Sequence, residues 1–184
     1  MLKFKFNEKK ATEVATILLE KNGGKMNYMK LIKLMYLIDR EALAEWERPL
    51  TGDSYFSLPH GPILSNVLDY INSGVEPGNP TYWHKYISKK NYEIALKSKP
   101  VIAELSKREI KLISKIYSKY KTYDQYALRD YCHKHLLEWE DPKGSALPIS
   151  VKDILIAVKK TEKEIAEIEE EITNLQFVSQ VLSC

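Results

Sequence analysis

Residues 28–63 read YMKLIKLMYLIDREALAEWERPLTGDSYFSLPHGPI, and this stretch decides the fold. It predicts a long helix that ends at Pro49, a turn at Thr51-Gly52-Asp53, and a short extended piece. Pro62, in the closing His60-Gly61-Pro62, is then expected in the first turn of the next helix. The apolar residues of the long helix recur at helical spacing: Leu31, Leu34, Met35, Ile38 and Ala42. Such a stripe is typical of a helix that faces a core.

One charged residue, Asp39, lies near this apolar stripe, one turn after Met35 and Tyr36. Burying a carboxylate without a partner costs free energy. We therefore expect Asp39 to pair with a histidine or a lysine, or to accept hydrogen bonds from backbone N–H groups.

The composition is that of one globular domain. The chain has 184 residues, of which 44% are hydrophobic and 29% are charged. It has no apolar run of the roughly 18 residues that a membrane helix needs, and its N-terminus lacks the features of a signal peptide. Two cysteines are too few for a disulfide framework, so we expect a cytoplasmic protein. The net charge of +3 and the pI near 8.6 are only mildly basic and do not favour nucleic-acid binding.

Start signals predict the remaining elements. Helices are expected to begin after Asn7, Asn27, Ser106, Thr122, Ser150 and Thr161, besides the one at Pro62. Tyr55–Ser57 indicates a short strand, and Trp83–Ser88 with Tyr92–Lys97 indicates a hairpin that can join it in a three-stranded sheet. The expected fold class is mostly α (α+β): a compact helical domain of about six to seven helices with a small antiparallel β-sheet.

The last helix carries its own apolar stripe, formed by Ile165, Ile168, Ile172 and Leu175. About two heptads are too short to require a coiled coil. We expect residues 1–158 to form the domain and residues 159–184 to form a C-terminal helix. Packing of this helix on its own domain is favoured, and association into a homo-oligomer through it is the alternative.

Catalytic signatures are missing from the sequence. It contains no P-loop, no dinucleotide glycine fingerprint, no HExxH and no nucleophile elbow. Cys132, His133, His135 and Glu138 are the one group with metal-ligand chemistry, but zinc usually takes paired elements from two segments. A buried cysteine with hydrogen-bonded histidines is the favoured interpretation, so we expect no catalytic residue, no cofactor and no metal.

Several segments together resemble the Panacea domain, also called the SocA-like antitoxin family. They are Lys30–Leu37, Pro49–Asp53, His60–Pro62, Leu105–Glu109, Leu128–His133, Glu138-Trp139, Pro148–Ser150 and Asp153–Leu155. The resemblance extends from Lys10 to about Val158, and it depends on the order and spacing of the segments rather than on any single motif. It implies a mostly helical domain with a small sheet.

The resemblance also implies a function, that of an antitoxin in a type II toxin–antitoxin system of bacteria, archaea or phages. Its partner would be a cognate protein toxin encoded by a neighbouring gene, and no membrane would be involved. Residues expected to contact the toxin as exposed side chains are Tyr55, Phe56, His60, His133 and Trp139. Two alternatives stay open. One is a metal-binding or enzymatic protein that uses Cys132, His133 and His135, and the other is a protease adaptor or nucleic-acid-associated regulator.

Overall fold

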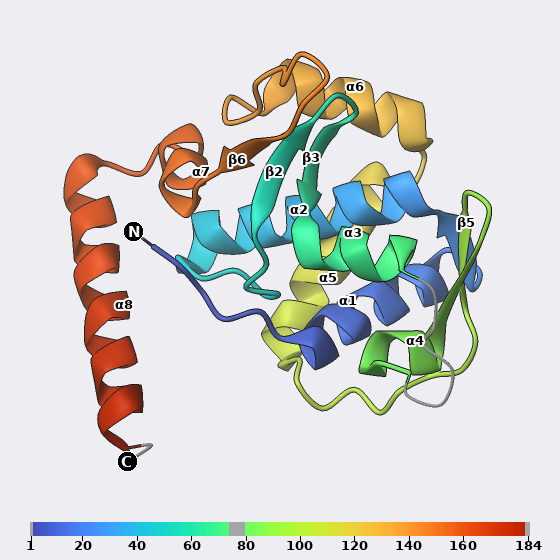
Figure 1. The fold of residues 1–184 in the computed structure, drawn as a ribbon, viewed down its shortest axis with the longest axis horizontal. Coiled ribbons are helices and arrows are strands. Elements are labelled where there is room, and N and C mark those ends of the chain that lie inside the picture. Colours follow the sequence, from blue (N-terminus) through green and yellow to red (C-terminus); the bar gives the residue numbers. More distant parts are fainter. Residues whose placement is uncertain (1, 74–79, 183–184) are drawn as a thin grey trace.

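The computed structural model describes residues 2–73 and 80–182, with side chains described as far as residue 174 (Figure 1). These residues form eight helices and six strands, so the prediction of a mostly helical fold with a small antiparallel β-component is confirmed. The helices are α1 (Glu8–Lys21), α2 (Tyr28–Trp46), α3 (Ser65–Asn72), α4 (Tyr82–Tyr86), α5 (Lys107–Tyr120), α6 (Gln125–His135), α7 (Val151–Ala157) and α8 (Glu162–Leu182). The strands are β1 (Lys25–Asn27), β2 (Tyr55–Leu58), β3 (Gly61–Leu64), β4 (Ile87–Lys90), β5 (Glu93–Leu96) and β6 (Leu147–Ile149).

Helix α2 is the centre of the molecule. It contacts α1, α5 and α6, and strand β3 crosses it (Figure 1). The whole predicted stripe is fully buried: Leu31, Leu34, Met35, Ile38 and Ala42. The expectation that α2 faces the core is therefore confirmed.

The strands form two separate sheets instead of the single sheet expected from the sequence. One sheet has the order β1-β5-β4 and the other has the order β3-β2-β6. Strand β2 pairs with the adjacent β3, Tyr55 opposite Leu64, across the two-residue turn at Pro59 and His60. This pairing closes a very short loop. Strand β6 pairs with the other edge of β2, so no edge of β2 is left for the β4–β5 hairpin.

Two of the predicted helix starts are wrong. Pro62 lies in strand β3, and α3 begins only at Ser65. No side chain at the N-cap of α3 bonds its backbone, but the Asp53 carboxylate accepts hydrogen bonds from the first-turn N–H groups of Asn66 and Val67. Helix α6 is capped by Asp124 rather than by Thr122, because Asp124 Oδ1 accepts from two first-turn N–H groups.

The other predicted starts are confirmed by their caps. The side chain of Asn7 accepts from Lys10 N, and that of Asn27 accepts from Met29 N. Capping boxes begin α5 at Ser106 and α7 at Ser150. Thr161 and Glu164 exchange the corresponding bonds at the start of α8.

The predicted β4–β5 hairpin exists, but its first arm is partly helical. Residues 82–86 form α4, whose N-terminus is capped by Thr81. The turn lies at Asn91 and Tyr92, where Asn91 adopts a positive φ of 56°. Asparagine tolerates this conformation better than most residues. The turn expected at residues 89–91 lies at residues 91–92 instead, because Lys89 and Lys90 still belong to β4.

Helix α8 lies along one side of the molecule, after a turn that follows α7 (Figure 1). Ile165, Ile168 and Ile172 are buried within this single chain and belong to its hydrophobic core. Leu175, the fourth residue of the predicted stripe, lies outside the described side chains. None of the described helices has the length and apolar character required to cross a membrane.

Candidate functional site

Four polar side chains on α2 reach into neighbouring segments, and we call Lys33, Tyr36, Asp39 and Arg40 the α2 polar row. Lys33, Tyr36 and Asp39 are almost completely buried. Lys33 and Asp39 each bond a different segment of the chain, and Tyr36 and Arg40 share one acceptor, Glu138. The row therefore ties β3, the loop before β2 and the loop after α6 to one helix.

Lys33 is a buried lysine that holds strand β3. Its Nζ donates a hydrogen bond of 2.8 Å to the carbonyl oxygen of Pro62. Burial lowers the pKa of the Lys33 ammonium to about 8, and the neighbouring Cys132 opposes this shift. Burying a charged lysine that has one carbonyl partner costs free energy. The contact therefore fixes the position of β3 and does not stabilise the fold.

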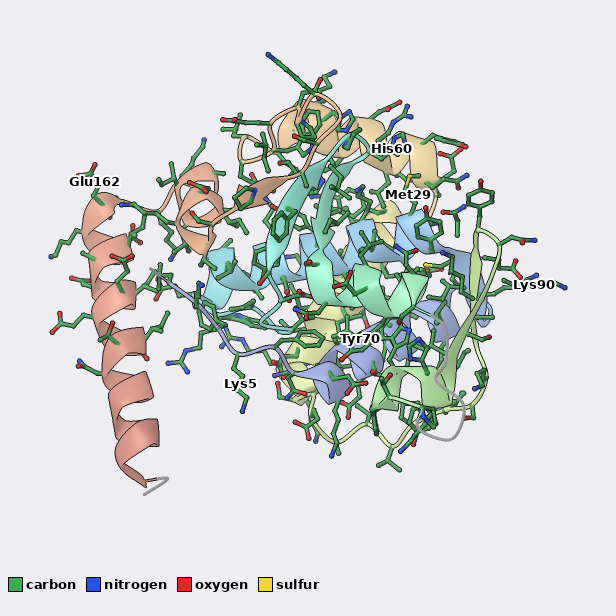
Figure 2. The ribbon with its side chains drawn as sticks, in the orientation of Figure 1. Lys5, Met29, His60, Tyr70, Lys90 and Glu162 are labelled. Atoms are coloured by element: carbon green, nitrogen blue, oxygen red, sulfur yellow. The ribbon has the colours of Figure 1, made fainter. Side chains whose placement is uncertain are left out.

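Gly61 is the residue that allows β3 to approach Lys33. Its φ is +95°, a backbone conformation that residues with a Cβ atom rarely adopt. A Cβ at this position would lie 3.0 Å from Lys33 Cε and 3.6 Å from Cys132 Cβ. The β2–β3 hairpin is thus seated directly on α2 and α6, and Figure 2 shows His60 at its tip.

Glu138 anchors the loop that follows α6. Its side chain is fully buried, and Oε1 accepts from Tyr36 OH at 3.0 Å and from Arg40 Nε at 2.7 Å. Arg40 Nη2 reaches the second carboxylate oxygen at 3.4 Å. Breaking such a buried pair leaves an uncompensated charge, so the loop position is strongly specified.

Asp39 fixes the turn before β2. Oδ1 accepts hydrogen bonds from the backbone N–H groups of Leu50 and Thr51, and Oδ2 accepts from the hydroxyls of Thr51 and Tyr55. Burial raises the pKa of Asp39 to about 6, although these hydrogen bonds oppose the rise. Of the partners expected from the sequence, the backbone N–H groups are the ones that the structure confirms.

His133 and Trp139 form one unit beside the hairpin tip. Their rings stack with centroids 3.9 Å apart and an interplanar angle of 12°. Trp139 Nε1 donates to the carbonyl oxygen of Leu58 at 3.1 Å, which joins this unit to β2. His60 follows two residues later and is exposed at the turn.

The five residues expected to form an exposed contact surface do not lie on one surface. Tyr55 is only 3% exposed, and its hydroxyl is committed to Asp39, so the expectation that it is exposed is wrong. Phe56, the next residue along β2, is half-buried and lines a depression together with Phe4 of the N-terminal segment. Of the five, the structure brings into contact only His133 and Trp139, and Trp139 is bonded to Leu58 of the β2–β3 hairpin.

The possible metal ligands after Tyr131 have different surroundings. Cys132 is buried beside Lys33 and Gly61, and burial raises the pKa of its thiol to about 12. His133 stacks on Trp139, while His135 is exposed and contacts the Tyr131 ring. In the described part of the chain, no group of three His, Cys, Asp or Glu side chains is placed to hold a metal ion.

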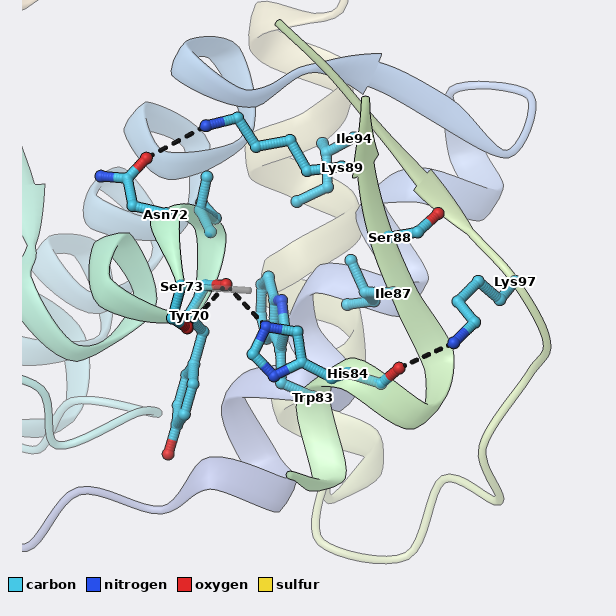
Figure 3. A pocket seen from close by; sticks show the side chains of 11 residues that line it. Tyr70, Asn72, Ser73, Trp83, His84, Ile87, Ser88, Lys89, Ile94 and Lys97 are labelled. Carbon is cyan, nitrogen blue, oxygen red and sulfur yellow. Dashed lines mark hydrogen bonds between the residues drawn. The ribbon is translucent and has the colours of Figure 1, made fainter. Parts of the chain in front are cut away.

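A depression of about 330 Å³ lies between α3 and the α4–β4 segment (Figure 3). His84 Nε2 donates to the Tyr70 carbonyl oxygen at 2.9 Å, and Nδ1 lies 2.8 Å from the Thr81 hydroxyl, so both ring nitrogens have partners. Lys97 Nζ donates to the His84 carbonyl oxygen at 2.9 Å. These groups hold α3 and α4 together, which leaves them little capacity to bind a ligand.

The sequence interpretation missed an exposed apolar surface that is formed by Leu137, Leu147 and Ile156. We call these three residues the α6–α7 surface; they are 78%, 37% and 55% exposed. All three line one depression of about 420 Å³ between the end of α6, β6 and α7. Ile156 could have been noticed from the sequence, because it lies outside the helical stripe of Val151, Ile154 and Leu155.

One comparison with known proteins gives a match. The family model described as "Antitoxin SocA-like, Panacea domain" matches residues 31–140, which is more than half of the chain. The matched region begins within α2 and contains the whole α2 polar row, the β2–β3 hairpin and Trp139. No curated protein and no solved structure matches the chain.

Proposed function

The chain belongs to the antitoxin SocA-like, Panacea domain family, and from this membership we propose that it is a non-catalytic antitoxin of a type II toxin–antitoxin system. It binds a protein toxin encoded by a neighbouring gene and neutralises that toxin in the cytoplasm. Residues 1–158 act as the antitoxin domain, and the C-terminal helix α8 packs on it. The family match is the single observation that carries this proposal.

The environment of the buried ionisable groups supports a binding role over a catalytic one. Lys33, Asp39 and Glu138 are buried, and each is bonded to other groups of the same chain. A general acid or base must come within hydrogen-bonding reach of a substrate. These side chains instead fix the positions of β3, the loop before β2 and the loop after α6, which carry the proposed contact residues.

The surface itself offers contacts of the kind that dominate protein interfaces. The stacked rings of His133 and Trp139 are bonded to Leu58, two residues before the exposed His60 of the hairpin turn, and apolar side chains are exposed on the α6–α7 surface. Aromatic and apolar anchors of this type supply most of the binding energy in many complexes. The rigid support beneath them reduces the ordering cost of binding.

The alternative of a metal or catalytic protein at Cys132, His133 and His135 is not favoured by their separate environments. A metal analysis of the purified protein decides between the two. Stoichiometric zinc that disappears in Cys132→Ala would support the alternative.

Co-expression tests the proposal. We expect the product of the neighbouring gene to arrest growth when expressed alone, and we expect the present chain to restore growth and to co-purify with that product. The proposal fails if the neighbouring product is harmless alone, or if growth is restored without any complex between the two proteins.

A further inference from the structure

The α6–α7 surface is a concentration of exposed apolar side chains. Of the six large hydrophobic side chains that are exposed in the described part of the chain, Leu137, Leu147 and Ile156 line a single depression. The other three, Tyr92, Val101 and Tyr126, do not line it. Contiguous apolar surface on a soluble domain commonly marks an interaction site.

The rim of this depression is acidic. Glu140 and Asp153 line it and are exposed, and the described lining residues include no lysine or arginine. Glu138 also lines it, but its charge is paired with Arg40. Asp153 Oδ2 accepts hydrogen bonds from Ser150 at the start of α7, whereas Glu140 lies beside the apolar side chains with no lysine or arginine among the described lining residues. Negative charge beside an apolar centre favours a partner that carries positive charge around an apolar anchor.

The backbone at this surface does not favour an added strand. Strand β6 is an edge strand of the β3-β2-β6 sheet, and its middle residue is Pro148. Proline has no N–H to donate, so an incoming strand would find a break in the hydrogen-bond ladder. Recognition here must depend on side chains rather than on strand addition.

The surface is also held rigidly. Glu140 N donates to Ser57 Oγ at 3.3 Å, and Glu138 is bonded to α2, so the chain directly after Leu137 is held at two points. Strand β6 pairs with β2, Leu147 opposite Ser57. A rigid apolar site loses little conformational entropy when a partner docks.

From these observations we propose that the α6–α7 surface receives an amphipathic segment of the toxin, one that inserts apolar side chains between Leu137, Leu147 and Ile156 and places lysine or arginine residues beside Glu140. This inference rests on the proposed antitoxin function. Leu147 and Ile156 lie beyond residue 140, where the family match ends. The surface therefore includes residues on both sides of that boundary, since Leu137 lies within the matched range.

The test measures the affinity of the purified chain for the purified product of the neighbouring gene. Ile156→Glu and Leu137→Glu each put a charge into the apolar centre, and we expect each to weaken binding roughly tenfold or more. Val101→Glu is the matched control, because Val101 is 81% exposed and does not line the depression; we expect it to bind like the unchanged chain. Near-ultraviolet circular dichroism verifies that each variant is folded.

A charge variant examines the acidic rim. Glu140→Lys should slow association and make the rate less dependent on salt, since a rim charge acts mainly on encounter. If the unchanged chain binds and both Ile156→Glu and Leu137→Glu bind equally well, the inference is overturned while the antitoxin function stands. If the unchanged chain neither binds nor neutralises the neighbouring product, the proposed function and this inference both fall.

Discussion

The α2 polar row and the α6–α7 surface use their side chains in opposite ways. The row takes polar groups out of water and gives each a partner, as with Arg40 and Glu138. The surface leaves apolar groups in water with no partner, as with Leu137 and Ile156. The difference indicates a division of labour, in which the row specifies where segments lie and the surface remains available for another molecule.

The comparison predicts that changes in the row or in its bonded partners act first on stability and that changes in the surface act first on binding. The largest effect is expected for Glu138→Ala, which leaves the Arg40 charge and the Tyr36 hydroxyl without their shared acceptor. We expect the free energy of unfolding to fall by about 3 kcal/mol in urea denaturation. Glu140→Ala, two residues further on, is the control and should change it by less than about 0.5 kcal/mol. Equal effects of the two changes would remove the distinction between row and surface.

Gly61→Ala tests how closely the hairpin must approach α2. The new methyl group would meet Lys33 Cε at 3.0 Å, on a backbone whose φ is +95°. We expect a loss of about 2 kcal/mol or more in the free energy of unfolding, measured by thermal or chemical denaturation. Gly144→Ala is the matched control, since φ is +86° there but a Cβ would meet nothing within 4 Å. It should lose only about 1 kcal/mol, and an equal loss at both sites would show that close approach to Lys33 is unimportant.

Lys33 makes the free energy of unfolding depend on pH. Burial lowers the pKa of its ammonium to about 8, whereas an unfolded lysine titrates at about 10.4. Above about pH 8 the unfolded chain binds more protons than the folded one, so this group adds stability as pH rises toward the unfolded pKa. Between about pH 7 and 9 the unchanged chain should gain about 1 kcal/mol relative to Lys33→Met. Parallel pH profiles of the two proteins would contradict a buried, easily deprotonated lysine.

The smallest effect on folding is expected at the surface itself. Ile156→Ser removes an apolar side chain that is 55% exposed, so the free energy of unfolding should change by less than about 0.5 kcal/mol. The same variant should bind the neighbouring gene product more weakly than the unchanged chain does. A large loss of stability would place Ile156 with the supporting framework instead of the binding surface.

The row was partly predictable from the sequence, whereas the surface was not. Asp39 near an apolar stripe requires a partner, and the structure supplies one from the following turn. Lys33 gave no such signal, because its acceptor is the backbone carbonyl of Pro62. Every residue type has a backbone carbonyl, so the sequence does not indicate which one accepts the bond. Helix starts were predictable where the cap is local, as at Ser106, and wrong where a distant side chain, Asp53, provides it.

The strands and the surface depend on tertiary pairing. The Tyr55–Ser57 strand was identified from its own residues, but its partners, β3 and β6, were not. Pro62 read as a helix start because proline suits the first turn, yet Gly61 and the Lys33 contact hold it in a strand. Leu137, Leu147 and Ile156 come from three separate elements, so no local pattern could bring them together.

Growth of cells that express the neighbouring gene product tests the central claim most directly, when that product is paired with the unchanged chain, with Ile156→Glu or with Val101→Glu. The account predicts that the unchanged chain and Val101→Glu restore growth, while Ile156→Glu does not, although all three accumulate as folded protein to the same level. Restoration by all three would contradict binding through the α6–α7 surface. Failure of the unchanged chain to restore growth would contradict the antitoxin function itself.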